Sequence, residues 1–68
     1  MNRMIIVSRF EADMQVAISW LRINKAVADI SETRNVDGVF MCDIMSKKTK
    51  KEVSALLALR FGRSVQAK

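Results

Sequence analysis

The chain has 68 residues, half of them hydrophobic, and a formal net charge of +5. A chain of this length forms one small domain, which buries only roughly 60% of the surface that the unfolded chain exposes. With no histidine and one cysteine, Cys42, a single chain can form neither an internal disulfide nor a four-ligand zinc site. We therefore expect one domain over residues 1–68, with no metal or cofactor, that gains stability as a homodimer.

The charge is unevenly distributed along the chain. Residues 1–46 carry five basic and six acidic side chains, whereas residues 47–68 carry seven basic side chains against Glu52 alone. The net charge is therefore −1 in the first part and +6 in the second. A concentrated basic segment favours a nucleic acid or an acidic protein surface as its partner.

The first apolar run covers residues 4–7 and is too short for the core of a signal peptide. No other stretch approaches the roughly 20 apolar residues of a membrane span, so we expect a cytoplasmic protein that does not enter membranes. The β-branched, continuously apolar character of the run predicts a strand buried on both faces.

A helix is predicted directly after this strand, because Ser8 and Glu11 have the spacing of a capping box. On a helical wheel, a narrow polar stripe faces a wide apolar arc formed by Ala12, Val16, Ala17, Trp20, Leu21 and Ile23. We place the end of the helix near Lys25, while a continuation through residues 26–34 is the alternative.

Residues 26–34 and 39–45 are predicted to pair as an antiparallel hairpin. Both segments alternate with a period of two, and Asp37-Gly38 between them is a strong turn signal. Phe40, Cys42 and Ile44 should face the core, which would make Cys42 a buried and inert thiol.

A second helix follows, since Thr49 and Glu52 again have capping-box spacing and Gly62 is placed to end it. This helix has almost no polar side, so we expect another chain to cover it. The expected protein interface consists of Leu56, Leu57, Leu59 and Phe61. Residues 63–68 are expected to fray. The fold class is α+β in the order β-α-β-β-α, with an antiparallel hairpin and both helices on one face.

The basic run before the second helix is the candidate functional site. Positive charges there oppose the helix dipole and repel one another, an arrangement that is unfavourable unless something negative binds. A solvated loop that keeps the protein soluble explains the run equally well. If the run instead binds an anion, the nucleic-acid-binding residues are Lys47, Lys48, Lys50, Lys51, Arg60 and Arg63.

The sequence therefore predicts a small regulatory or accessory protein that binds DNA or RNA. An enzyme is not expected, because histidine is absent, Cys42 has no base to activate it, and Asp29 and Asp43 are explained as exposed strand residues. The alternative is a protein-binding modulator, an inhibitor or adaptor of the phage or plasmid type. Such a protein would dock through the apolar second helix or an edge of the hairpin.

Overall fold

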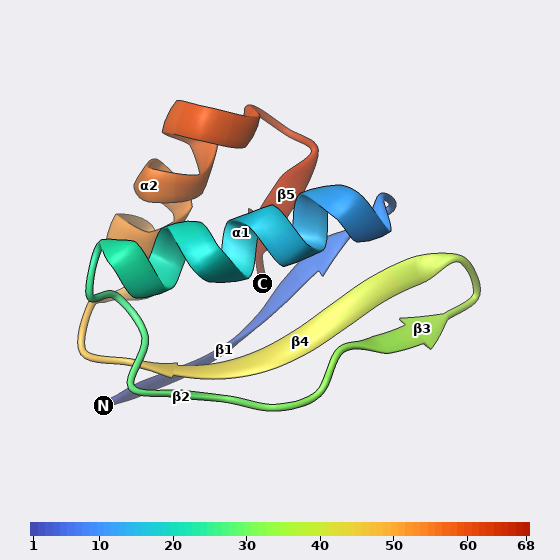
Figure 1. Ribbon diagram of the computed structural model, residues 1–68. Helices are drawn as coiled ribbons and strands as arrows, with labels where there is room; N and C mark the ends of the chain where they lie inside the picture. Colours follow the sequence, from blue (N-terminus) through green and yellow to red (C-terminus); the bar gives the residue numbers. More distant parts are fainter.

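The computed structural model describes residues 1–68 as two helices on one face of a five-stranded antiparallel sheet (Figure 1). The predicted α+β class is confirmed, and one further strand follows the second helix. In chain order the elements are β1 (Asn2–Ser8), α1 (Glu11–Ile23), β2 (Asp29–Ile30), β3 (Arg34–Val36), β4 (Val39–Ser46), α2 (Lys50–Phe61) and β5 (Val65–Ala67).

The first strand of the chain lies in the middle of the sheet. The strand order is β2-β4-β1-β5. The short strand β3 also pairs with β4, along the same edge of β4 as β2. Helix α1 connects β1 to β2, which are parallel to each other and have β4 between them. Helix α2 connects β4 to β5, which are parallel to each other and have β1 between them. This is the split β-α-β arrangement.

The expectation that residues 63–68 fray is wrong. Val65–Ala67 form β5, and the backbones of Lys68 and Ile5 exchange two hydrogen bonds of 2.7 and 3.1 Å. Val65 is fully buried opposite Ser8 of β1. The segment is too short to show a hydrophobic period, so its pairing with β1 is what makes it a strand.

The hairpin prediction is confirmed, but its first strand is divided in two. Ile30 lies opposite Ile44, and Arg34 lies opposite Met41. Between these two pairs the chain advances by four residues from β2 to β3 but by only three residues in β4. The extra residue is a bulge that separates β2 from β3. The predicted turn has positive φ at both Asp37 (53°) and Gly38 (82°), which suits a tight two-residue connection.

One hydrophobic core lies between the sheet and the two helices. From the sheet it takes Met4 and Ile6 of β1, Cys42 and Ile44 of β4, and Val65 of β5. From the helices it takes Met14, Ala17 and Leu21 of α1 and Val53 and Leu57 of α2. Cys42 is buried, as its alternation with Phe40 and Ile44 predicts.

The orientation of α1 and its N-terminal cap differ from the prediction. Val16 and Ile23, assigned to the apolar arc, are exposed, and the buried row is centred on Ala17 instead. Ser8 does not cap the helix, because it is the last residue of β1; the N-cap is Phe10, which forms no side-chain cap. Neither α1 nor α2 has the length and apolar character of a membrane-crossing segment.

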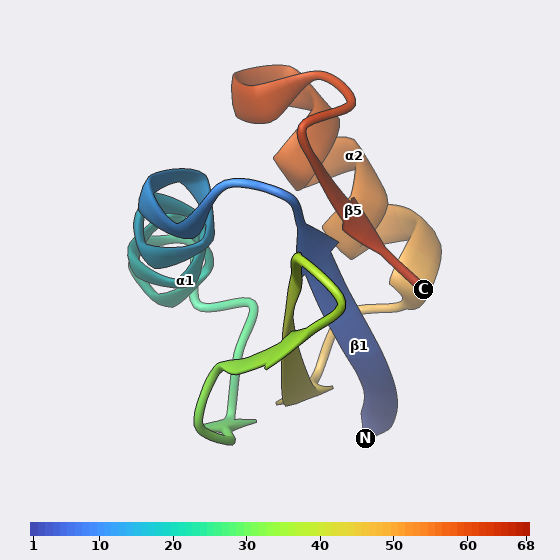
Figure 2. The ribbon, with the colours of Figure 1, turned by 90° about the vertical axis from the view of Figure 1, so that its right-hand side faces the viewer.

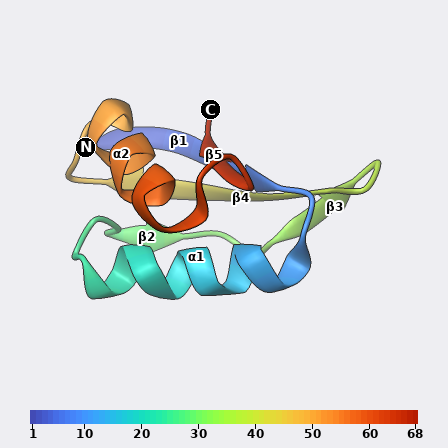
Figure 3. The same ribbon diagram turned by 90° about the horizontal axis from the view of Figure 1, so that it is seen from above.

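The face of the sheet remote from the helices is open (Figure 2). The prediction that β1 is buried on both faces is therefore wrong, because only every second residue of the strand is buried. Ile5, Val7, Met41 and Met45 occupy the centre of this face and are partly exposed. In the view from above, α1 lies beside β2, while α2 and β5 lie near β1 (Figure 3). The molecule therefore has an α1 side and an α2–β5 side.

Candidate nucleic-acid interface

The four lysines of the basic run surround the start of α2. Lys47 and Lys48 lie in the connection from β4, and Lys50 and Lys51 are the first two helical residues. The connection is held in place, because Asn2 Nδ2 donates to the carbonyl of Lys48 at 2.9 Å and the Lys48 N–H donates to Ser46 Oγ at 2.9 Å. None of the four ammonium groups forms an ion pair.

The predicted capping box of α2 is confirmed. The Glu52 N–H donates to Thr49 Oγ1 at 3.2 Å, and the Thr49 N–H donates to Glu52 Oε1 at 3.0 Å. These hydrogen bonds hold the pKa of the Glu52 carboxyl below its usual value, and the charge of Lys48 acts in the same direction. The one carboxylate near the lysines is therefore engaged in the cap of its own helix.

The two predicted arginines lie in different places. The guanidinium carbon of Arg60 is 5.1 Å from the ring centroid of Trp20 on α1, so Arg60 packs towards α1 and away from the lysines. Arg63 lies in the turn between α2 and β5 and lines a hollow together with Arg9 and Lys68. Arg60 thus contributes to the contact between the helices, and Arg63 is available to a ligand.

Folding collects six of the twelve basic side chains on one side of the molecule. The segment around Lys48 contacts Asn2 at the start of β1, and Lys68 lies opposite Ile5. Arg63 comes just before Val65, which pairs with Ser8 at the end of β1. Asn2 and Ser8 lie about 20 Å apart at ~3.3 Å per residue. We call the cations along this side the basic edge: Lys47, Lys48, Lys50, Lys51, Arg63 and Lys68.

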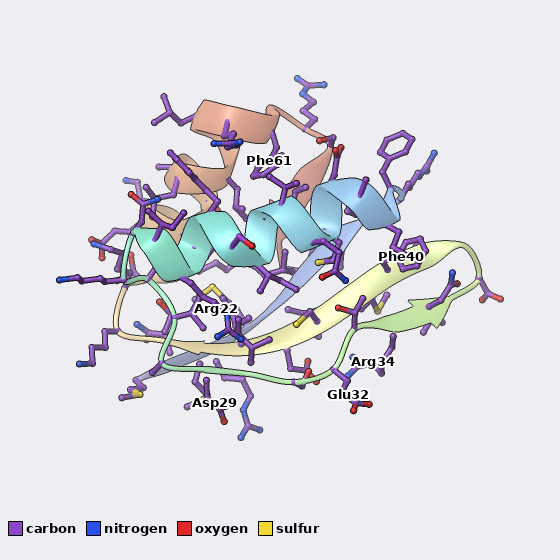
Figure 4. All side chains as sticks on the ribbon, viewed as in Figure 1. Arg22, Asp29, Glu32, Arg34, Phe40 and Phe61 are labelled. Carbon is purple, nitrogen blue, oxygen red and sulfur yellow. The ribbon has the colours of Figure 1, made fainter.

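The acidic side chains lie elsewhere. Apart from Glu52, all of them belong to α1 or to the β2–β4 segment: Glu11, Asp13, Asp29, Glu32, Asp37 and Asp43. Asp29 and Glu32 project from the sheet on the side remote from the helices (Figure 4). The part of the protein formed by β1, α1 and the β2–β4 segment is therefore nearly neutral, and the excess positive charge lies around α2 and β5.

Asp43 is committed to an ion pair on the open face of the sheet. Its carboxylate accepts a hydrogen bond of 2.7 Å from Arg34, which lowers the pKa of Asp43. Asp29 lies opposite Met45 and is not paired with Asp43. No three carboxylate or thiol side chains of the protein are arranged to hold a metal ion.

The four apolar residues predicted as a protein interface do not form one surface. Leu57 is buried in the protein's own core, and Leu56 and Phe61 are partly buried against it. Phe61 lies between α2 and α1 in Figure 4, and the Leu56 carbonyl accepts a hydrogen bond of 3.0 Å from Trp20 Nε1. Leu59, 79% exposed, is the most accessible of the four, and Leu56 borders the same open hollow on α2.

The sequence pattern does not indicate Arg9 or Lys68 as binding residues, although folding brings both beside Arg63. No local signal indicates them, because they meet only when β5 pairs with β1. Comparison of the chain with protein-family models, with curated proteins and with solved structures found no match in any of the three. The fold and this charge distribution are therefore the observations on which a function can be argued.

Proposed function

We propose that this protein binds nucleic acid through the basic edge, as a small regulatory or accessory protein. The observation that supports the proposal is the gathering of unpaired cationic side chains on one side of the fold, where the only acidic side chain, Glu52, is held in a helix cap. Like charges brought together in this way repel one another, and a polyanion relieves that repulsion.

The dimensions of the basic edge suit a phosphate backbone. Each strand of a duplex carries a phosphate about every 3.4 Å, so an edge of ~20 Å spans about six phosphates. Lys50 and Lys51 stand at the start of α2, where the helix dipole adds to the attraction of an anion. Contacts of this kind position a protein on nucleic acid without reading its sequence.

The test compares two double variants that remove the same charge from opposite sides of the protein. Lys50→Gln/Lys51→Gln removes two charges from the basic edge, and Arg22→Gln/Lys25→Gln removes two exposed charges from the α1 side. Binding to a fluorescent oligonucleotide is measured by anisotropy at several salt concentrations. The first variant should weaken binding and flatten the slope of log K against log salt by about 1.4 to 1.8, at ~0.7 to 0.9 per contact.

The control variant should bind nearly as the parent does. Equal losses in both variants would show that only net charge attracts the oligonucleotide, which contradicts a defined basic edge. A parent protein that binds neither DNA nor RNA at low salt would refute the proposal altogether. Circular dichroism should show both variants folded, since all four side chains are exposed.

Docking onto another protein is the second candidate function. Leu59 favours it, because this exposed side chain borders an open apolar hollow on α2 that Ala55 and Leu56 also line. Binding through such a patch depends little on salt, unlike binding to phosphates. Leu59→Ala should abolish protein docking and leave nucleic-acid binding unchanged.

A further inference from the structure

A hollow of about 490 Å³ lies where β1, β5 and the start of α1 meet. It opens on the uncovered face of the sheet, since Val7 and Gln66, which line it, lie opposite each other on that face. The side chains that give it chemical character are Arg9, Phe10, Arg63, Gln66 and Lys68. The hollow forms one end of the basic edge.

Three cationic side chains line this hollow and no acidic side chain does. The one ion pair of the protein joins Arg34 to Asp43, so Arg9, Arg63 and Lys68 have no acidic partner. A guanidinium presents a planar set of donors that matches a phosphate group, and an ammonium adds a third charge. The hollow is therefore suited to an anion with several oxygens.

The two turns that carry these cations are held by side-chain hydrogen bonds. The Phe10 N–H donates to Ser8 Oγ at 3.1 Å, which fixes the turn between β1 and α1. Ser64 Oγ donates to the Phe61 carbonyl at 3.1 Å, and Gln66 Nε2 donates to the Arg63 carbonyl at 3.2 Å. These bonds order both walls of the hollow before any ligand arrives, which reduces the entropic cost of binding.

Phe10 is the aromatic group of the hollow, and 57% of its surface is exposed. The other two phenylalanines, Phe40 and Phe61, pack against the core. The open face of the sheet has only aliphatic, sulfur-containing and polar side chains on β1 and β4, so it offers no aromatic platform. Phe10 is thus the one aromatic ring beside the cations on which a flat ligand can stack.

We infer that the hollow binds one nucleotide of a single-stranded nucleic acid, with the phosphate at Arg9, Arg63 and Lys68 and the base stacked on Phe10. Combining a basic groove with an exposed aromatic ring is how proteins hold single strands. The bases of a duplex are stacked on one another and cannot reach the ring. This inference rests on the proposed function and adds to it that the preferred substrate is a single strand.

The test uses oligothymidylate and a mixed-sequence duplex of equal length, with affinity measured by fluorescence anisotropy. Phe10→Ala should weaken binding of the single strand about 5- to 140-fold, the effect of losing one stacked base. The salt slope should stay unchanged, because no phosphate contact is lost. Phe10→Trp should restore affinity, and the bound base should quench the fluorescence of the new ring.

Ile23→Ala is the matched control, because Ile23 is 75% exposed on the α1 side, and it should bind as the parent does. Arg63→Gln should lower affinity and flatten the salt slope by about 0.7. Duplex binding should be weaker than single-strand binding and insensitive to Phe10→Ala.

Two results would overturn the inference, and they can be told apart. If Phe10→Ala binds oligothymidylate as tightly as Ile23→Ala does, the stacking site is wrong while the basic edge still stands. If the parent binds neither oligonucleotide, both the hollow and the proposed function fail.

Discussion

Replacing Leu57 and Leu59 by alanine, one at a time, tests which side of α2 faces the core. The two residues lie two positions apart on the same helix, yet Leu57 is 1% exposed and Leu59 is 79% exposed. Removal of a buried leucine side chain costs about 2–5 kcal/mol, from lost burial and the cavity left behind. Substitution of an exposed residue changes stability by about 0.5 kcal/mol or less.

The expected loss at Leu57 is large for so small a protein. At 0.05–0.15 kcal/mol per residue, a domain of this size has a total stability of about 3–10 kcal/mol. Leu57→Ala should therefore lower the melting temperature by at least about 8 °C, or leave the chain largely unfolded. Leu59→Ala should melt within a few degrees of the parent.

Urea and thermal unfolding followed by circular dichroism provide the measurement. Fluorescence of Trp20 gives a second probe, since its indole N–H bonds to the backbone of α2. Equal melting temperatures for the two variants, or a larger loss for Leu59→Ala, would refute the orientation of α2. Such a result would also restore Leu57 as a candidate for contact with a partner.

Two further predictions follow from the structure, and a third, homodimerisation, comes from the composition of the sequence. Cys42 should react slowly with a thiol reagent unless denaturant is added. Its Sγ is buried 3.2 Å from the Ser31 carbonyl oxygen, and burial raises the pKa of the thiol. Rapid labelling of the folded protein would show that the register of β4 is wrong. The lowered pKa of Glu52 implies that its contribution to stability is fully present above the ordinary pKa range of glutamate and is lost as the pH falls through the folded value. The difference in melting temperature between the parent and Glu52→Gln should therefore shrink on acidification, and a widening difference would contradict the cap. Homodimerisation predicts a mass of twice 7.7 kDa by light scattering at micromolar concentration, and the mass of a single chain would refute it.

Features determined by neighbouring residues could be predicted from the sequence. The hairpin turn requires positive φ at Asp37 and Gly38, and the cap of α2 needs only Thr49 and Glu52. Ser8 and Glu11 have the same spacing as Thr49 and Glu52 but do not form the capping box that this spacing predicts. Ser8 belongs to β1, where its position is set by Phe40 and Val65, residues far away in the chain.

Features that depend on distant partners could not be predicted. α2 is apolar almost all round, so its sequence contains no polar stripe to indicate that Leu57 faces inward and Leu59 outward. In the candidate site, the contiguous lysines were visible in the sequence. Arg9, Phe10 and Lys68 were not, since only the pairing of β5 with β1 brings them into one hollow.

The central position of β1 makes folding dependent on contacts of high sequence separation. Met4 pairs with Ile44, and Ile6 pairs with Ala67 near the other end of the chain. A topology of this kind has a high contact order and is expected to fold slowly for its size. During synthesis β1 is made first and completes its pairing last. Until residues 65–67 are available, one edge of this apolar strand stays unpaired and can template association between unfinished chains.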